Sequence, residues 1–140
     1  MRPGQVLSYG FTGLHNPGPA IVTIDRVGLA DPRGLRQVAA YVVPGRNVLY
    51  GVYRGYPPTP YMSPGVVWVA RQRARGAILR PMRKASANGT HIQQDTLLLV
   101  IKMPRRRGTA KGVTIWYQAG GSKYFLQTAT SLVTQGTCPS

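Results

Sequence analysis

Short apolar segments separated by glycine and proline run along the whole chain, and this pattern limits the chain to a fold built from strands and turns. The 17 glycines and 12 prolines are spread through the sequence rather than collected in one tract. Both residues destabilise the interior of a helix, so this spacing leaves little room for long helices. No segment keeps a helical period over two turns. We therefore predict an all-β domain.

The segments between these breaks have the length and the β-branched content of strands. They cover residues 5–12, 20–29, 35–44, 66–72, 95–103, 112–118 and 122–133, with shorter pieces at 47–53 and 76–82. About seven or eight strands at this spacing predict an immunoglobulin-like or Greek-key β-sandwich. The length of 140 residues predicts a single domain over residues 1–140.

Two segments carry more detailed expectations. DTLLLVIKM, residues 95–103, predicts a central strand that is buried on both faces, because apolar residues fill consecutive positions. GVTIWYQ and SKYFLQTATSLV predict a final hairpin around AGG, with a glycine-containing loop of about three to five residues.

Asp25 lies inside an otherwise apolar strand segment, and it therefore needs a partner or exposure to water. Strict alternation places Ile24 and Arg26 on one face of this strand and Asp25 on the other. An ion pair between Asp25 and Arg26, Arg33 or Arg36 is the expected solution.

The charge of the chain predicts a polyanionic partner. Lysine and arginine number 18 against 3 aspartates and no glutamate, which gives a net charge of +15. A positive field over most of a small domain attracts polyanions and releases their counterions. Nucleic acid, anionic lipid headgroups and anionic cell-wall polymers all present such charge, so the composition leaves the choice between them open.

Two basic clusters are the candidate polyanion contacts. The first follows the predicted central strand, and the second lies in RQRARGAILRPMRK. Their members are Arg105, Arg106, Arg107 and Lys111 in the first, and Arg71, Arg73, Arg75, Arg80, Arg83 and Lys84 in the second. The alternative interpretation of the first cluster is a solvated loop tip that blocks edge pairing. Few aromatic residues lie within the clusters, which counts against base stacking. The sequence leaves open whether the clusters form one patch.

A proline- and tyrosine-rich stretch, YRGYPPTPYMSPG, is a candidate partner loop. Its candidate contacts are Tyr53, Tyr56, Pro57, Pro58 and Tyr61. PPTP can form a polyproline II segment for a protein partner, and the tyrosines can form a platform for sugars. The alternative is an ordered loop whose tyrosines cover the open end of the core.

The residues needed for catalysis are scarce. Carboxylates, histidines and thiols occur only at Asp25, Asp31, Asp95, His15, His91 and Cys138. Acid–base pairs, nucleophile–histidine pairs and metal sites need several such groups at matched spacing. We therefore predict no enzyme, no catalytic residue, no cofactor, no metal site and no small-molecule substrate.

Two stretches carry a resemblance to a known family. GLHNPGPAIVTIDRVGLADPRGLRQVAAYVVPG, residues 13–45, and VTIWYQAGGSKYFLQT, residues 113–128, resemble the small extracytoplasmic β-sandwich domains of actinobacterial envelope proteins of unassigned function. The resemblance covers about half of the chain and carries no functional residues. It implies an exported, non-enzymatic interaction or structural module, with its export segment outside this chain.

The sequence thus favours a cell-envelope or secreted interaction module whose basic surface meets an anionic polymer, a membrane surface or a protein partner. The alternative is a cytoplasmic nucleic-acid-binding domain that uses the arginine-rich loops as phosphate contacts. A signal or membrane segment in the full gene would favour the first function, and a preference for one nucleic acid at physiological salt would favour the second.

Overall fold

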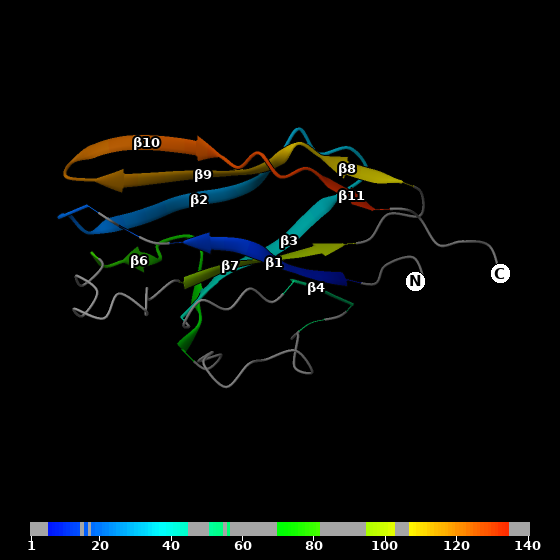
Figure 1. Ribbon diagram of the computed structural model, residues 1–140, viewed down its shortest axis with the longest axis horizontal. Coiled ribbons are helices and arrows are strands. Elements are labelled where there is room, and N and C mark those ends of the chain that lie inside the picture. Colours follow the sequence, from blue (N-terminus) through cyan, green and yellow to red (C-terminus); the bar gives the residue numbers. More distant parts are fainter. Residues whose placement is uncertain are drawn as a thin grey trace, which may run out of the picture.

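The computed structural model describes residues 6–14, 16, 18–44, 51–54, 56, 70–81, 95–102 and 107–134 (Figure 1). Its strands are β1 (Val6–Leu14), β2 (Val22–Ala30), β3 (Arg36–Val43), β4 (Gly51–Arg54), β5 (Gln72–Arg73), β6 (Ile78–Leu79), β7 (Asp95–Lys102), β8 (Gly108–Ala110), β9 (Gly112–Ala119), β10 (Ser122–Gln127) and β11 (Leu132–Thr134). These ranges contain no α-helix, which confirms the prediction of an all-β chain.

The strands form two main sheets that pack together. One sheet has the order β4-β1-β7-β3-β5, the other has the order β10-β9-β2-β6, and β11 pairs with β8 in a small third sheet. Every pairing between these strands is antiparallel. Figure 1 shows β10, β9 and β2 as one layer above the layer that contains β1, β7 and β3.

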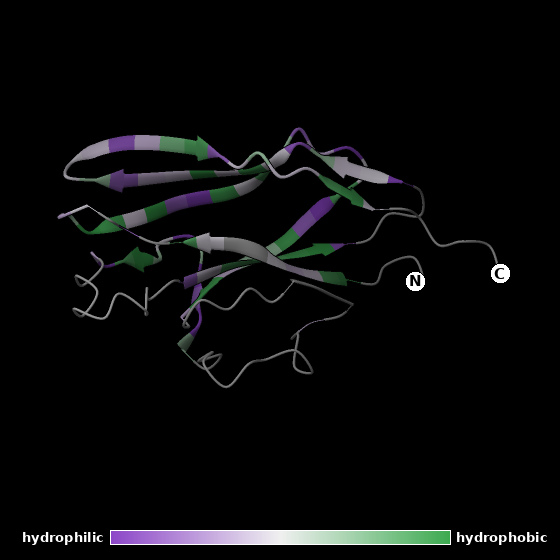
Figure 2. Ribbon diagram, in the orientation of Figure 1, coloured by the Kyte–Doolittle hydropathy of each residue, from purple (hydrophilic) through white to green (hydrophobic). Residues whose placement is uncertain are grey.

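The core lies between these two layers. Ile24 from β2 and Ile115 from β9 meet Leu97, Leu99 and Ile101 from β7 in one buried cluster. Each of these five side chains is at most 3 % exposed. Figure 2 shows hydrophobic colour along β7, whereas hydrophobic and hydrophilic residues mix along β2. The core is therefore built from every second residue of the central strands.

Strand β7 is buried on both faces, as predicted. Residues 96–101 are all buried, although alternate side chains point to opposite faces of a strand. On the outer face, Leu98 and Val43 form a second cluster together with Tyr41 and Tyr56. The rings of Tyr41 and Tyr56 stack with their centres 5.6 Å apart. The outer face of the five-stranded sheet is thus covered at its centre.

The predicted alternation of β2 is wrong at its middle. Ile24 pairs with Tyr117, but the next pair along the strand joins Arg26 to Trp116, so Asp25 forms a β-bulge. The extra residue shifts the pattern by one position. As a result Arg26 is exposed whereas Ile24 and Val27 are both buried.

The final hairpin also differs from the prediction. Strand β9 ends at Ala119 and β10 begins at Ser122, so the turn contains two residues, Gly120 and Gly121, instead of three to five. Both glycines have positive φ, 58° and 82°, which suits the type I′ turn that two-residue hairpins favour. The predicted strand at 122–133 is divided into β10 and β11, and β11 pairs with β8.

The number of strands is larger than predicted because β8 was not predicted and the segment 122–133 contains two strands. Four strands contain only two or three residues. These are β5, β6, β8 and β11. Strands this short are set by a few hydrogen bonds to a neighbour rather than by a pattern of their own. Of the predicted strand at 66–72, only residues 70–72 lie within the described residues.

Asn16 joins the turn after β1 to β6. Its Nδ2 donates to the carbonyl oxygens of Ala20, at 2.7 Å, and Leu79, at 3.0 Å, and its Oδ1 accepts from the Gly18 amide at 3.1 Å. We expect Asn16→Ala to lower the free energy of unfolding by about 1–3 kcal/mol, because the buried bond to the Leu79 carbonyl oxygen is lost. Urea denaturation measures this difference, and an unchanged midpoint would contradict the structural role of Asn16.

Candidate polyanion-binding edge

The segment that carries β5 and β6 connects the edges of the two sheets. The Ala74 amide donates a hydrogen bond to the carbonyl oxygen of Ala40 in β3 at 2.9 Å. The Gly76 amide donates one to the carbonyl oxygen of Ile24 in β2 at 2.7 Å. Ala74 and Ala77 are nearly fully buried, and their small side chains allow the segment to approach both strands closely. This placement leaves the arginines of the same segment exposed at the edge.

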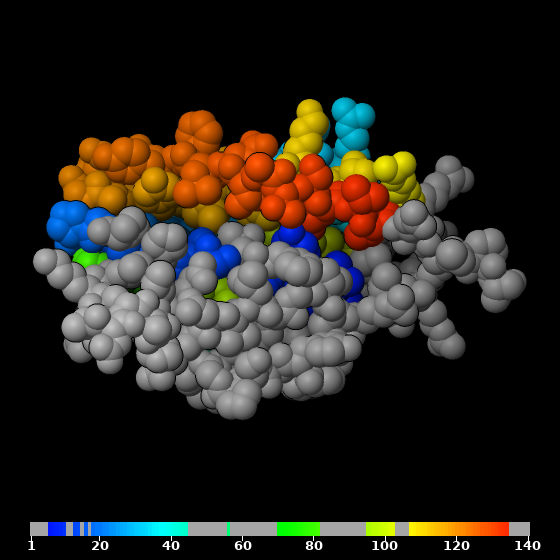
Figure 3. Space-filling view, in the orientation of Figure 1, coloured from blue at the N-terminus to red at the C-terminus, as the bar shows by residue number. Residues whose placement is uncertain are grey.

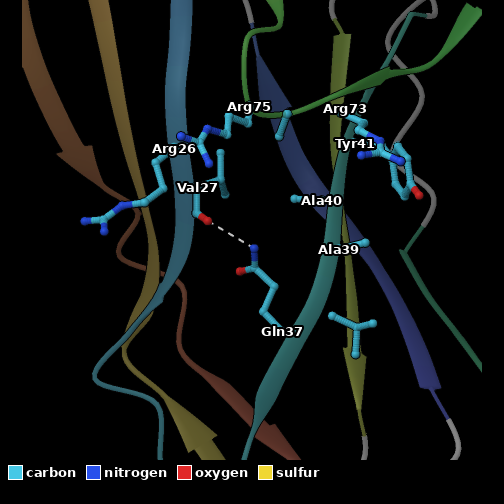
Figure 4. A pocket seen from close by; sticks show the side chains of 10 residues that line it. Arg26, Val27, Gln37, Ala39, Ala40, Tyr41, Arg73 and Arg75 are labelled. Carbon is cyan, nitrogen blue, oxygen red and sulfur yellow. Dashed lines mark hydrogen bonds between the residues drawn. The ribbon is translucent and has the colours of Figure 1, made fainter.

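Two of these arginines, Arg73 and Arg75, line a hollow of about 410 Å³ between β2 and β3 together with the exposed Arg26 of β2. Figure 4 shows Arg26 and Arg75 on the β2 side and Arg73 beside Tyr41 on the β3 side. We call this group the arginine edge. Within the described residues, Arg73 and Arg75 have no carboxylate at ion-pair distance, since the ion pair found there joins Lys111 and Asp31. Their guanidinium groups can therefore bind an external anion.

Gln37 spans the hollow from β3 toward β2 (Figure 4). Its Nε2 donates to the Val27 carbonyl oxygen at 3.0 Å. Its Oε1 is buried and has no donor among the described residues. A buried acceptor of this kind is available to a hydroxyl group that enters the hollow. The hollow therefore has a neutral acceptor on its inner side, and the arginines lie around it (Figure 4).

Aromatic rings lie against the arginines on both sides of the hollow. The Cζ atom of Arg26 lies 3.9 Å from the centre of a ring of Trp116, and that of Arg71 lies 5.9 Å from the ring centre of Tyr41. These are cation–π distances. Burial raises the pKa of the Tyr56 hydroxyl, and its contact with Tyr41 raises it further, while Arg71 lowers it in part. The rings hold Arg26 and Arg71 in place beside the edge.

A second group of cations lies at the other end of β3, around β8. Arg33 forms an isolated bridge with Thr109, and Arg36 pairs with Lys102 of β7. Figure 3 shows side chains of the segments before β3 and around β8 projecting next to one another. The exposed cations of this region are Arg33, Arg36, Lys102, Arg107 and Lys111, and we call them the β8 end. Lys111 is paired with Asp31 at 3.4 Å, a solvent-exposed contact that contributes less than about 1 kcal/mol.

The two groups are separate patches on one strand. Arg36 at the β8 end and Tyr41, which pairs with Arg73, are five residues apart on β3. At about 3.3 Å per residue this separation is roughly 17 Å. A small anion can occupy one patch, whereas only an extended polymer can contact both.

Six of the ten predicted polyanion contacts lie within the described residues. Arg71, Arg73, Arg75, Arg80, Arg107 and Lys111 are all exposed. Arg105, Arg106, Arg83 and Lys84 lie outside the described residues. Of the predicted partner loop, Tyr56 packs against the second cluster, and Tyr53 has its backbone in β4. The side chain of Tyr53, together with Pro57, Pro58 and Tyr61, lies outside the described part.

Sequence reasoning missed Arg26, Arg33, Arg36 and Lys102 as members of these patches. Each is a single cation within or beside an apolar strand, and an isolated charge of this kind gives no cluster in the sequence. The exposed position of Arg26 depends on the bulge at Asp25, and the pairing of Arg36 with Lys102 joins segments 66 residues apart. Strand pairing, rather than sequence proximity, creates both patches.

The expected ion pair of Asp25 is not formed within the described residues. Its Oδ1 instead accepts a hydrogen bond from Gln118 Nε2 at 2.8 Å, across the β2–β9 pair.

Burial raises the pKa of the Asp95 carboxyl at the start of β7. In the part of the chain that the structure describes, no three His, Cys, Asp or Glu side chains gather in a group that could hold a metal ion.

A scan against protein-family models and searches of curated proteins and of solved structures found no match to this chain. Among the described residues, no helix has the length and apolar character needed to cross a membrane.

Proposed function

We propose that the protein is a non-catalytic interaction module of the cell envelope or of secreted material, and that it binds an anionic polymer along β3. The observation that carries this proposal is the presence of two exposed cationic patches at the two ends of one strand. With three carboxylates for eighteen cations, the chain cannot neutralise its own surface. An extended polyanion that spans both patches neutralises them together and releases its counterions.

The proposed architecture is an immunoglobulin-like β-sandwich of the Greek-key type. The order β1-β7-β3 in one sheet and β10-β9-β2 in the other supports it. If β1, β2, β3, β7, β9 and β10 take the places of strands B, C, D, E, F and G, these orders correspond to B-E-D and G-F-C of immunoglobulin domains. Domains of this architecture commonly serve as binding modules, which agrees with the proposed function only by analogy of fold.

A nucleic-acid-binding domain of the cytoplasm is the second candidate. The stacking of Arg26 on Trp116 favours this candidate, because proteins that bind single-stranded nucleic acids combine aromatic rings with nearby cations. This arrangement supplies the aromatic neighbours that the sequence clusters lack. The two candidates differ in whether affinity depends on the bases of the ligand or only on its charge.

The test is the affinity for heparin, single-stranded DNA, double-stranded DNA and RNA at about 50 and 200 mM salt. We expect all four to bind and to weaken together as salt rises. We expect Arg73→Ser and Arg75→Ser each to weaken heparin binding by about fivefold at the lower salt, since one cation near an anionic surface contributes about 1 kcal/mol. The double variant should lose roughly 30-fold.

Lys123→Ser is the matched control, because it removes one exposed cation from β10, on the opposite edge of its sheet from β6. Its affinity should stay close to that of the parent. An equal loss from Lys123→Ser and Arg75→Ser would overturn the proposed edge in favour of a diffuse positive field. One nucleic acid that remains bound at the higher salt while heparin is released would favour the second candidate. Fractionation of the native host cells tests the proposed location.

A further inference from the structure

The β10 edge, residues 122–127, ends the four-stranded sheet, and it is independent of the arginine edge. Within the described strands β10 has one neighbour, β9. All six residues of β10 are exposed, although three of them are large and apolar. Tyr124 is 49 %, Phe125 69 % and Leu126 44 % exposed. An apolar edge strand of this kind is a template for pairing with another strand.

The hairpin geometry determines which backbone groups of β10 face outward. The Thr128 amide donates to the Val113 carbonyl oxygen at 2.9 Å, so the amide of Thr128 faces β9. Hydrogen-bonded and non-hydrogen-bonded pairs alternate along an antiparallel ladder. The N–H and C=O groups of Lys123, Phe125 and Gln127 therefore point away from β9, toward the open edge.

We propose that β10 pairs with β10 of a second copy of this chain, in an antiparallel register centred on Phe125. In this register Phe125 faces its own counterpart, Lys123 faces Gln127 of the partner subunit, and Tyr124 faces Leu126 of the partner subunit. Every outward N–H and C=O group of Lys123, Phe125 and Gln127 finds a partner, which forms about six backbone hydrogen bonds. Aromatic and aliphatic side chains face one another, and no two cations are directly opposed.

The self-complementary register, in which apolar residues face apolar residues and Lys123 faces Gln127 of the partner subunit, favours a second copy as the occupant. Both copies are strongly cationic, but Lys123 is the one cation within β10, and the register places it opposite a glutamine. The arginine edge borders the other side of β2, so pairing through β10 leaves it open in both copies. The pair forms one continuous sheet with the order β6-β2-β9-β10-β10-β9-β2-β6. A contact of single strands is small, so we expect a reversible dimer.

Disulfide trapping tests the register. In a Cys138→Ser background, we expect Phe125→Cys to form a disulfide-linked dimer under mild oxidation, because hydrogen-bonded partners lie about 5.5 Å apart at their Cα atoms. Lys123→Cys is the matched control. Its counterpart lies four residues away along the strand, roughly 14 Å, beyond the reach of a disulfide. Equal yields from the two variants, or no trapped dimer from Phe125→Cys, would overturn the proposal.

Sedimentation of the free protein gives an independent readout. The parent should shift from monomer to dimer as its concentration rises, and more so at about 1 M than at 0.1 M salt, because salt screens the repulsion between two cationic copies. Phe125→Lys places like charges opposite one another and should remain monomeric at every concentration. A monomeric parent would refute pairing through β10. Salt has opposite effects on the two proposed interactions, since it weakens polyanion binding and strengthens pairing through β10. Failure of one proposal can therefore be distinguished from failure of the other.

Discussion

Replacing Gly112 with alanine should lower the free energy of unfolding by more than about 3 kcal/mol. Gly112 begins β9 with a φ angle of +150°, a backbone conformation that residues other than glycine rarely adopt. A Cβ atom at this position would meet the backbone oxygen of Thr128, so the backbone itself would have to move. The Val113 amide also donates a hydrogen bond to the hydroxyl oxygen of Thr128 at 3.0 Å, and this bond holds Thr128 close to β9. Chemical denaturation followed by circular dichroism measures the loss.

The matched control for this substitution is Gly120→Ala in the hairpin turn. Gly120 also has positive φ, +58°, but a Cβ atom there would meet no atom within 4 Å. Only the left-handed backbone is then penalised, by about 1–2 kcal/mol. If the two variants lost equal stability, the close approach of Thr128 to Gly112 would have no energetic consequence.

The second large effect is expected at Leu98. This side chain is fully buried on the outer face of the five-stranded sheet, against Val43, Tyr41 and Tyr56. Leu98→Ala should lower the free energy of unfolding by about 2–5 kcal/mol, the range for deletion of buried methyl groups. Leu99→Ala, on the inner face of the same strand, should lose a similar amount. The two losses are compared by urea denaturation.

The outer face of the five-stranded sheet is covered at Leu98, whereas antiparallel sheets commonly leave one face to solvent. A sandwich with a solvated outer face would tolerate Leu98→Ala, and its loss would stay within about 0.5 kcal/mol, as at other surface positions. A loss that small, alongside a large loss for Leu99→Ala, would show that Tyr56 does not seal the outer face. Comparable losses would show that β7 is stabilised equally from both sides.

Much of the strand content could be predicted from single segments. The segment 20–29, the central strand at 95–103 and the hairpin that begins at 112 carry strong local patterns, and the structure has β2, β7 and the β9–β10 pair there. Burial of β7 on both faces follows from its consecutive apolar residues. The short strand β8 was not predicted, because a few hydrogen bonds to the distant strand β11 define it. Sequence patterns report the period of one strand, whereas these bonds depend on its neighbours.

The candidate site was predicted in part. The arginines of the segment 71–80 cluster in the sequence and predict a cationic surface there, and Arg73 and Arg75 do line the hollow. Arg26 joins them only because the bulge at Asp25 moves it to the exposed face, and no alternation pattern reveals a bulge in advance.

The sequence by itself determined the secondary-structure class and the sign of the surface charge. Glycine and proline spacing excludes long helices, and eighteen cations against three carboxylates make the surface positive wherever the chain folds. The tertiary structure decided where this charge gathers and which described strand, β10, ends its sheet. Arg36 meets Lys102, and Arg73 lies beside Tyr41, through pairings between segments distant in the chain. Local propensity acts over a few residues, whereas a patch depends on which strands become neighbours.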